Sequence, residues 1–507
     1  MRFAWGLVFA ARLLAVPATP PAAGPPQPAV PAAQIVQSLR QHEPVDFNAV
    51  HIVGALDLRG IDTVTTAVLC RDCTLDGLTM ANVTFARTID FTGATIGGPV
   101  DGSGATFGGP VLFGGTTFGG DLDLSDATLA DLADFSGSTF DGTVRFDAAH
   151  FRDVAQFDNV DVQGPASYLG ASFGARASFS GISQPDLAAR QPLTKAGCGP
   201  SIRTGGGFEQ RVDFRQATFA GQADFRQVCV VGPAMFGQTS FAGPLLADQS
   251  HLSADATFDN ARFDGGASFV DAGFGSLSSF SRASAGGLVD FEAAAFAAVP
   301  VFSYFDSTAV MSFNDTRFPS RVIFDHVTAK ELDIAFSDIG RLGAARADAL
   351  TLVENGARAR GDIALANHAR YDRLAIEGSN RVGVHGMADW LGYRVVAGYL
   401  VRPLRPLGWL VAAVLVAALI RTLWWRRRTR RGSSGPAVSF AYEVQRGVGI
   451  AVSRKAYADD KDGGTESTWA LVGRWLEWGL YKALLLAIIV GVANSNDTLR
   501  QMLDAIK

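Results

Sequence analysis

The 507-residue chain has few of the residues that build common catalytic and metal sites. It holds four cysteines, too few for a disulfide scaffold, and seven scattered histidines. No GxSxG, HExxH, phosphate-binding glycine loop or metal-spaced His/Cys group stands in a suitable context. The sequence therefore predicts no enzyme, no catalytic residue, no metal site and no cofactor.

Large apolar residues other than phenylalanine are also scarce. The chain holds 8 Tyr and 6 Met beside 35 Phe and 56 Gly. A globular core mixes its large apolar residues, so this bias indicates one packing solution that is used many times.

Charge is distributed unevenly along the chain. Residues 44–384 carry 39 acidic and 24 basic residues, a net charge of −15, whereas the remaining residues carry a net charge of +10. Phosphate contacts need cations, so this acidic body argues against nucleic acid as a direct ligand. It suits solubility or a basic protein partner.

The large apolar residues recur in steps that alternate between six and five residues. One run extends from Phe85 to Phe179, and a second extends from Phe208 to Phe324. On an α-helix such steps rotate by about 240° and 140°, which would scatter the rings to both sides. The 11-residue period therefore favours short strands over a helix.

Each repeat fits a strand followed by a corner. In the example of residues 133–137, Ala133 and Phe135 share one face, Asp134 points the other way, and Gly137 suits a tight turn. The pattern predicts that the apolar pair lies inside and the polar residue outside.

The segments "FGGPVLFGGTTFGGDLDL" and "VDFRQATFAGQADF" resemble the pentapeptide-repeat family. The resemblance implies an all-β solenoid, a right-handed, four-sided β-helix with a 5+6 alternation and about 22 residues per coil. Phenylalanines would then stack at about 4.8 Å per coil. Stacked rings belong to the core, so the repeat predicts a fold and says little about function.

The repeat also predicts how the body is divided. We expect a capping helix over 34–44, a first run of coils over 45–179, and a second run over 208–384 whose last coils are degraded. Residues 180–207 interrupt the register as a polar, Pro/Gly-rich loop, which is either a tolerated surface loop or a binding element.

Two cysteine pairs allow separate interpretations. Cys198, in the loop, and Cys229, on an outward position, are a possible disulfide if the compartment is oxidising. Cys70 and Cys73 form a CxxC motif, which favours buried structural thiols, with a redox motif as the alternative.

The C-terminal part predicts two membrane spans. Residues 406–425 and 475–493 are apolar, and the intervening segment 426–474 begins with a cluster of arginines. The positive-inside rule then places 426–474 in the cytoplasm and the repeat body outside it. Glu477 and Lys482, near the start of the second span, are expected to pair or to reach the interface.

The flanking segments agree with this topology. Residues 1–18 resemble a signal peptide or hydrophobic segment and 19–33 a Pro/Ala-rich linker, while 385–405 would be a juxtamembrane helix and 494–507 a short extracytoplasmic tail. The stretch 398–410 is similar to the juxtamembrane part of bacterial membrane-bound pentapeptide-repeat proteins, which implies a multi-pass protein of the bacterial cell membrane.

The leading functional hypothesis is a non-enzymatic, membrane-anchored scaffold that presents a regular surface to an unknown protein partner. One alternative is a cytoplasmic DNA mimic that binds topoisomerase or another nucleic-acid enzyme, as some members of the family do. A second alternative is an accessory subunit of a transporter or channel. Asp101 and Asp123, 22 residues apart, are a faint candidate cation site, although a solvated acidic face explains them better. The sequence leaves the oligomeric state open.

Overall fold

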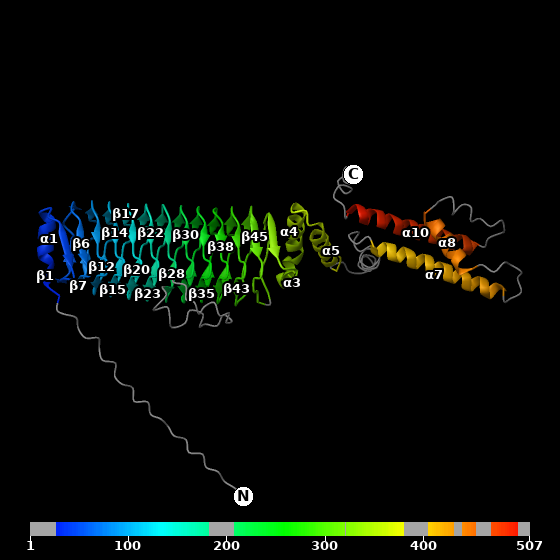
Figure 1. The fold of residues 1–507 in the computed structure, drawn as a ribbon, viewed down its shortest axis with the longest axis horizontal. Coiled ribbons are helices and arrows are strands. Elements are labelled where there is room, and N and C mark those ends of the chain that lie inside the picture. Colours follow the sequence, from blue (N-terminus) through cyan, green and yellow to red (C-terminus); the bar gives the residue numbers. More distant parts are fainter. Residues whose placement is uncertain are drawn as a thin grey trace, which may run out of the picture.

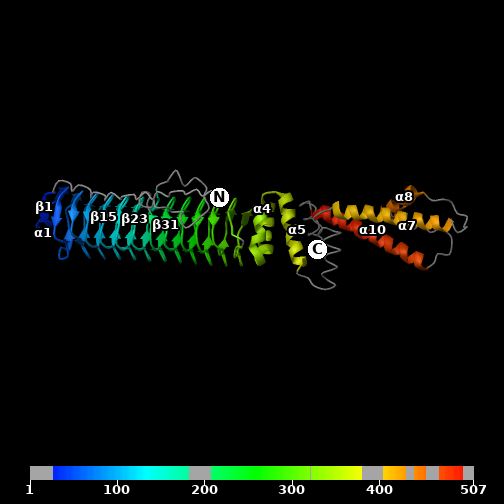
Figure 2. The same ribbon diagram turned by 90° about the horizontal axis from the view of Figure 1, so that it is seen from below.

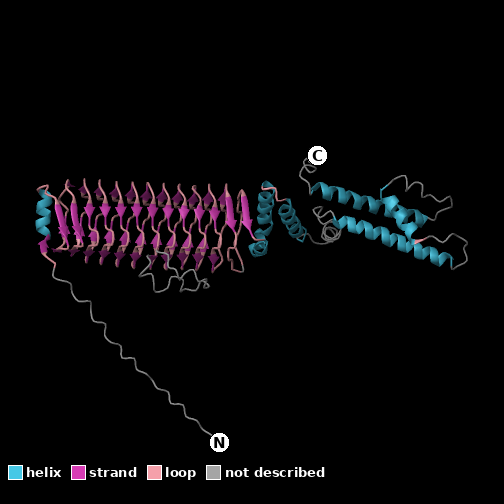
Figure 3. Cartoon of the chain, viewed as in Figure 1, coloured by secondary structure: helices cyan, strands magenta, loops and turns pink. Residues whose placement is uncertain are grey.

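The computed structural model describes residues 27–181, 207–319, 321–379, 404–429, 439–452 and 468–494. A long rod of short strands leads through two helices, α4 (Arg346–Ala359) and α5 (Ile363–Ser379), to a separate group of helices (Figure 1). The same arrangement is seen from below in Figure 2. The chain is therefore an all-β body with a helical C-terminal unit, as Figure 3 makes clear by colour.

The rod is a parallel β-solenoid with four faces. Its strands form four sheets of 12, 13, 10 and 11 strands, and one coil is built from β10 (Ile89–Asp90), β11 (Thr95–Ile96), β12 (Val100–Asp101) and β13 (Thr106–Phe107). Each strand pairs in parallel with the strand one coil away, 22 residues along the chain, as in Ile89↔Val111. The four-sided solenoid and its 22-residue coil are confirmed.

The alternation of five and six residues reflects two kinds of corner. The five-residue steps contain a turn whose third residue has positive φ, for example Gly115 (φ 66°), and whose ends are joined by a hydrogen bond from Thr116 N to Phe113 O (3.0 Å). This is the geometry of a type II turn. Asn82, Asp126 and Gln227 have positive φ at the same turn position in other coils.

Gly115 offers a test of this corner geometry. A β-carbon added there would meet no atom within 4 Å, so Gly115→Ala would lose stability only through its left-handed φ, by about 1 kcal/mol. Gly114→Ala is the matched control, because Gly114 lies outside the positive-φ region and its added β-carbon makes an ordinary contact at 3.4 Å. Chemical denaturation of the two variants should separate them, and equal stabilities would contradict the assignment.

Stacked aromatic rings fill the inside of the solenoid. On one face Phe135 stacks on Phe157 at 5.1 Å between ring centroids, and on another Phe118 stacks on Phe140 at 4.8 Å. Rings of neighbouring faces meet edge to face, as Phe146 and Phe157 do at 5.3 Å. These spacings agree with the stacking distance expected for adjacent coils.

Both ends of this core are covered. At the N-terminal end, β1 (Ala29–Pro31) pairs with β3 (His51–Val53), and α1 (Ala32–Arg40) buries Ile35 and Leu39 against the first coil. At the other end, α4 follows β46 (Glu331–Ile334) and adds Ala349, Leu350 and Val353 to the core.

The C-terminal end corrects one prediction. The residues that follow β46 were expected to continue as degraded coils to position 384, but they form α3 (Phe336–Ile339), a 3₁₀ helix (Gly340–Ala345), α4 and α5. The apolar residues of α4 recur at helical spacing, and the phenylalanine-and-turn pattern stops before them. Residues 350–376 therefore hold a helical cap whose leucines only imitated an 11-residue repeat.

The helical unit consists of α7 (Leu404–Thr429), α8 (Phe440–Val452) and α10 (Thr468–Asn494). Two predicted boundaries were wrong. The segment 426–474 is not simply a loop, because it contains α8 and the first part of α10, and α7 extends beyond residue 425. The predicted segments 1–18 and 385–403 and nearly all of 19–33, 180–207 and 494–507 lie outside the described residues.

Candidate functional site

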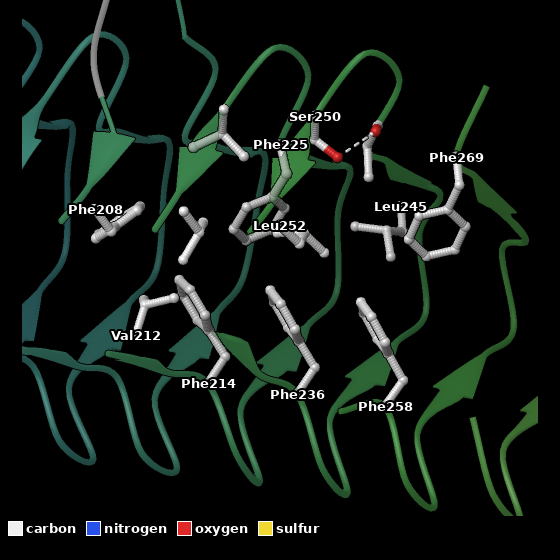
Figure 4. Close-up of a pocket in the computed structure, with 13 residues that line it drawn as sticks. Phe208, Val212, Phe214, Phe225, Phe236, Leu245, Ser250, Leu252, Phe258 and Phe269 are labelled. Atoms are coloured by element: carbon white, nitrogen blue, oxygen red, sulfur yellow. Dashed lines mark hydrogen bonds between the residues drawn. The ribbon is translucent and has the colours of Figure 1, made fainter. Parts of the chain in front are cut away.

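The described part of the chain presents no concave polar site. Within it, no group of three or more His, Cys, Asp or Glu side chains could hold a metal ion. A small cavity of about 20 Å³ lies inside the solenoid, lined by rings such as Phe214, Phe236 and Phe258 (Figure 4). Its lining is apolar apart from Ser250, whose hydroxyl donates to the carbonyl of Ala247 (2.7 Å). A cavity of this size and lining could not hold a substrate.

A gap in the ring stack explains the cavity. Ala247 occupies the inward position that Phe225 and Phe269 hold in the adjacent coils, and Val230 and Leu252 replace rings on the neighbouring face. The cavity is therefore a packing defect.

Asp101 and Asp123 do lie side by side, on paired strands of one face. Each carboxylate is already engaged with its own coil, since Asp101 accepts from the backbone N–H of Ser103 (3.1 Å) and Asp123 from that of Ser125 (2.9 Å). Asp123 also lies 3.8 Å from Arg145. These contacts fit a solvated outer face.

The outer surface of the body is regular. Threonines align in two ladders on paired strands, with Thr74, Thr95, Thr117 and Thr139 on one sheet and Thr63, Thr84, Thr106 and Thr128 on another. A partner that meets these faces would find the same hydroxyl at every coil.

The helical unit has the opposite polarity, with apolar residues outside and charges inside. Trp409, Val416, Ile420, Leu476 and Leu486 expose between 46% and 70% of their surface. Inside, Arg421 forms ion pairs with Glu443 (2.8 Å) and Glu477 (2.7 Å). Among the described helices, α7 alone meets the length and hydropathy expected of a membrane span, over Leu404–Trp424 with a mean hydropathy of 2.0.

Comparison with known proteins gives one match. Residues 103–150 match the family of pentapeptide repeats (9 copies). The solenoid extends the same repeat geometry to both sides of that segment. The chain is a pentapeptide-repeat protein. No curated protein and no solved structure matches it. Pentapeptide-repeat β-solenoids are typically non-enzymatic, and this one suggests a protein-interaction scaffold.

The pentapeptide-repeat body contains buried carboxylates that the repeat pattern did not predict. The side chain of Asp224 is fully covered, and it accepts from Arg226 (Nε–Oδ1 2.8 Å, Nη2–Oδ2 2.6 Å) and from Arg176 (3.2 Å). Asp213 is held in the same way by Arg211 and Arg215. The available signal was the Asp-Phe-Arg triplet, because residues two apart in a strand share a face.

Asp224 should make stability depend on pH. Burial acts to raise the pKa of its carboxyl, but the hydrogen bonds and charges of Arg226 and Arg176 outweigh burial and lower that pKa. The carboxylate therefore stabilises the fold above the unfolded pKa of about 3.9, and this contribution is lost as the pH falls through the lower folded pKa. Unfolding measured against pH should show Asp224→Asn destabilised at pH 7, and the difference from the parent should shrink on acidification. A pH-independent difference would contradict this role.

The cysteines correct a second prediction. Cys70 and Cys73 are both buried, as expected, but they form a disulfide and are not free thiols. They occupy the first and last positions of a corner whose third residue, Asp72, has positive φ, so both side chains point inward at a Cα separation of 5.5 Å. Cys229 is disulfide-bonded as well. Cys198 lies outside the described residues, so its pairing with Cys229 stays a prediction.

Proposed function

We propose that the protein is a non-enzymatic scaffold that a helical membrane anchor holds at the cell membrane, with the pentapeptide-repeat body outside the cytoplasm. The observation that carries the proposal is the polarity of α7, α8 and α10, whose outer surfaces are apolar while their charged side chains face inward. In water such an arrangement would expose a large apolar area, whereas in a bilayer it leaves no charge facing lipid.

The disulfides support the extracytoplasmic placement of the body. Cys70–Cys73 and the bonded Cys229 belong to the pentapeptide-repeat body, and such bonds persist mainly in oxidising compartments. The arginines that follow the apolar part of α7, among them Arg426 and Arg427, favour a cytoplasmic position for that end. Both features point to the same topology.

The body and the anchor are in contact. Arg405, at the start of α7, donates to the hydroxyl of Tyr371 on α5 (3.1 Å), and its guanidinium lies 5.4 Å from the centre of that ring. The helical cap of the solenoid therefore rests on the first turn of α7, which supports a body held close to the membrane surface.

Site-directed labelling of membranes from a bacterial host tests the topology. A cysteine at Gln238, an exposed corner of the body, should react with a membrane-impermeant maleimide in right-side-out vesicles, and Arg427→Cys should react only in inverted vesicles. The parent chain, whose four cysteines give the background, is the blank. Labelling of Gln238→Cys only in inverted vesicles would overturn the proposal and favour the cytoplasmic DNA mimic.

A further inference from the structure

Helix α8 lies in the segment that joins α7 to α10, yet it packs against both helices. Its inward face is a stripe at every fourth residue, formed by Glu443, Gly447 and Ala451. A β-carbon on Gly447 would lie only 2.9 Å from Cγ1 of Val414 on α7. Because residues four apart share one face of a helix, this stripe fixes which side of α8 contacts the other two helices.

The contacts of α8 place it at a definite depth along α7. Glu443 meets Arg421, three residues before the end of the candidate span at Trp424. Ala451 packs with Val414, ten residues before that end, and with Tyr481 of α10. At a rise of 1.5 Å per residue, Val414 lies about 15 Å inside the span, near the middle of a hydrocarbon core that is about 30 Å thick.

The polar groups of α8 are satisfied at these depths. Glu443 is almost completely buried and binds Arg421, with Arg446 at 3.5 Å, while the second carboxylate on Arg421, Glu477, accepts from the hydroxyl of Tyr481 (2.6 Å). Lys482 donates from Nζ to the carbonyl of Ala451 (3.2 Å), in the last turn of α8. A helix end in hydrocarbon leaves carbonyls that need such donors.

The outward face of α8 continues the apolar surface of α7. Phe440, Tyr442 and Val448 expose 42%, 59% and 50% of their surface, beside the exposed Leu415 and Leu419 of α7. Glu443 and Arg446 face inward, and the exposed positions of α8 carry no charge.

We propose that α8 is a re-entrant helix that enters the bilayer from the cytoplasmic side and whose outward face contacts lipid acyl chains. The inference rests on the membrane anchoring proposed above. The segment between α7 and α10 is then part of a three-helix membrane domain. Arg421 joins α8 to α10 through Glu443 and Glu477, and Lys482 satisfies the end of α8.

Labelling of the full chain in inverted vesicles tests this placement. Val448→Cys should react with an impermeant maleimide at least about tenfold more slowly than Arg427→Cys, because a thiol reacts as the thiolate, which needs water. Detergent should remove the difference. Adding Gly447→Leu to Val448→Cys should push α8 away from Val414 and bring the rate to within about threefold of Arg427→Cys, whereas adding Gly449→Leu, on the exposed side, should not.

The two proposals fail in different ways. If Val448→Cys reacts as fast as Arg427→Cys in inverted vesicles, α8 lies in water and the inference is wrong, although the anchor stands. If Arg427→Cys fails to react in inverted vesicles and reacts in right-side-out vesicles, the proposed topology itself is wrong. If Gly447→Leu leaves the protection of Val448→Cys unchanged, packing against Val414 does not hold α8, and the inference is also overturned.

Discussion

Replacing Phe157 by alanine is expected to lower the free energy of unfolding by about 3–5 kcal/mol, because the change removes a buried ring from a close-packed stack. Phe157 is fully buried between Phe135 and Phe179, at 5.1 and 4.9 Å between ring centroids, and it meets Tyr168 edge to face at 5.6 Å. The loss should appear as a lower midpoint in chemical denaturation followed by circular dichroism.

The adjacent residue supplies the control for that experiment. Gln156 lies on the same strand, β22 (Ala155–Gln156), and is partly exposed on the outer face. Gln156→Ala should therefore change stability by less than about 0.5 kcal/mol. Similar losses for Phe157→Ala and Gln156→Ala would mean that the ring stack is not what stabilises the coil.

Replacing Arg421 by alanine is expected to be the most damaging single change in the helical unit. It leaves Glu443, whose side chain is 1% exposed, and Glu477 without their ion-pair partner, and removing one side of a buried pair costs about 3–5 kcal/mol. Titration of the detergent-solubilised protein with a denaturing detergent should show the loss as earlier unfolding of the helical signal.

Two further variants separate the ion pairs from simple packing. The triple variant Arg421→Ala/Glu443→Ala/Glu477→Ala should be more stable than Arg421→Ala alone, because it leaves no uncompensated carboxylate. Arg427→Ala, on an exposed residue one and a half turns away, should have little effect. A triple variant that is less stable than Arg421→Ala would show that uncompensated charge is not the cause.

The body could be predicted from the sequence because each coil repeats one local rule. The steps of five and six residues fixed the period of 11, and the paired apolar positions of segments such as 133–135 fixed which side chains point inward. What the repeat could not predict are the contacts between coils that depend on particular side chains. Asp224 occupies an ordinary outward position, and only Arg176, 48 residues earlier, and Arg226 together cover it.

The end of the solenoid and the helical unit were predicted less well, for different physical reasons. Leu350 and Leu352 fit a strand and a helix equally well over so short a stretch, so the change from coil to cap at α4 was missed. The arginines of 426–431 made the following segment read as a cytoplasmic loop. The four-residue spacing of Glu443, Gly447 and Ala451 was present in the sequence, but its meaning depends on Val414 and Arg421, which lie elsewhere in the chain.

The 22-residue coil gives this protein a reach that changes in fixed increments. With α1 at one end of the solenoid and the membrane helices beyond the other, each coil sets the N-terminal end about 4.8 Å farther from the bilayer. Loss or duplication of 22 residues would shorten or lengthen the rod by one increment and leave every outward column in register. A change of 11 residues would instead turn everything beyond it by half a revolution, so that the Thr95 ladder would continue on the opposite side. Evolution can therefore adjust the height of this surface above the membrane independently of the direction in which it faces.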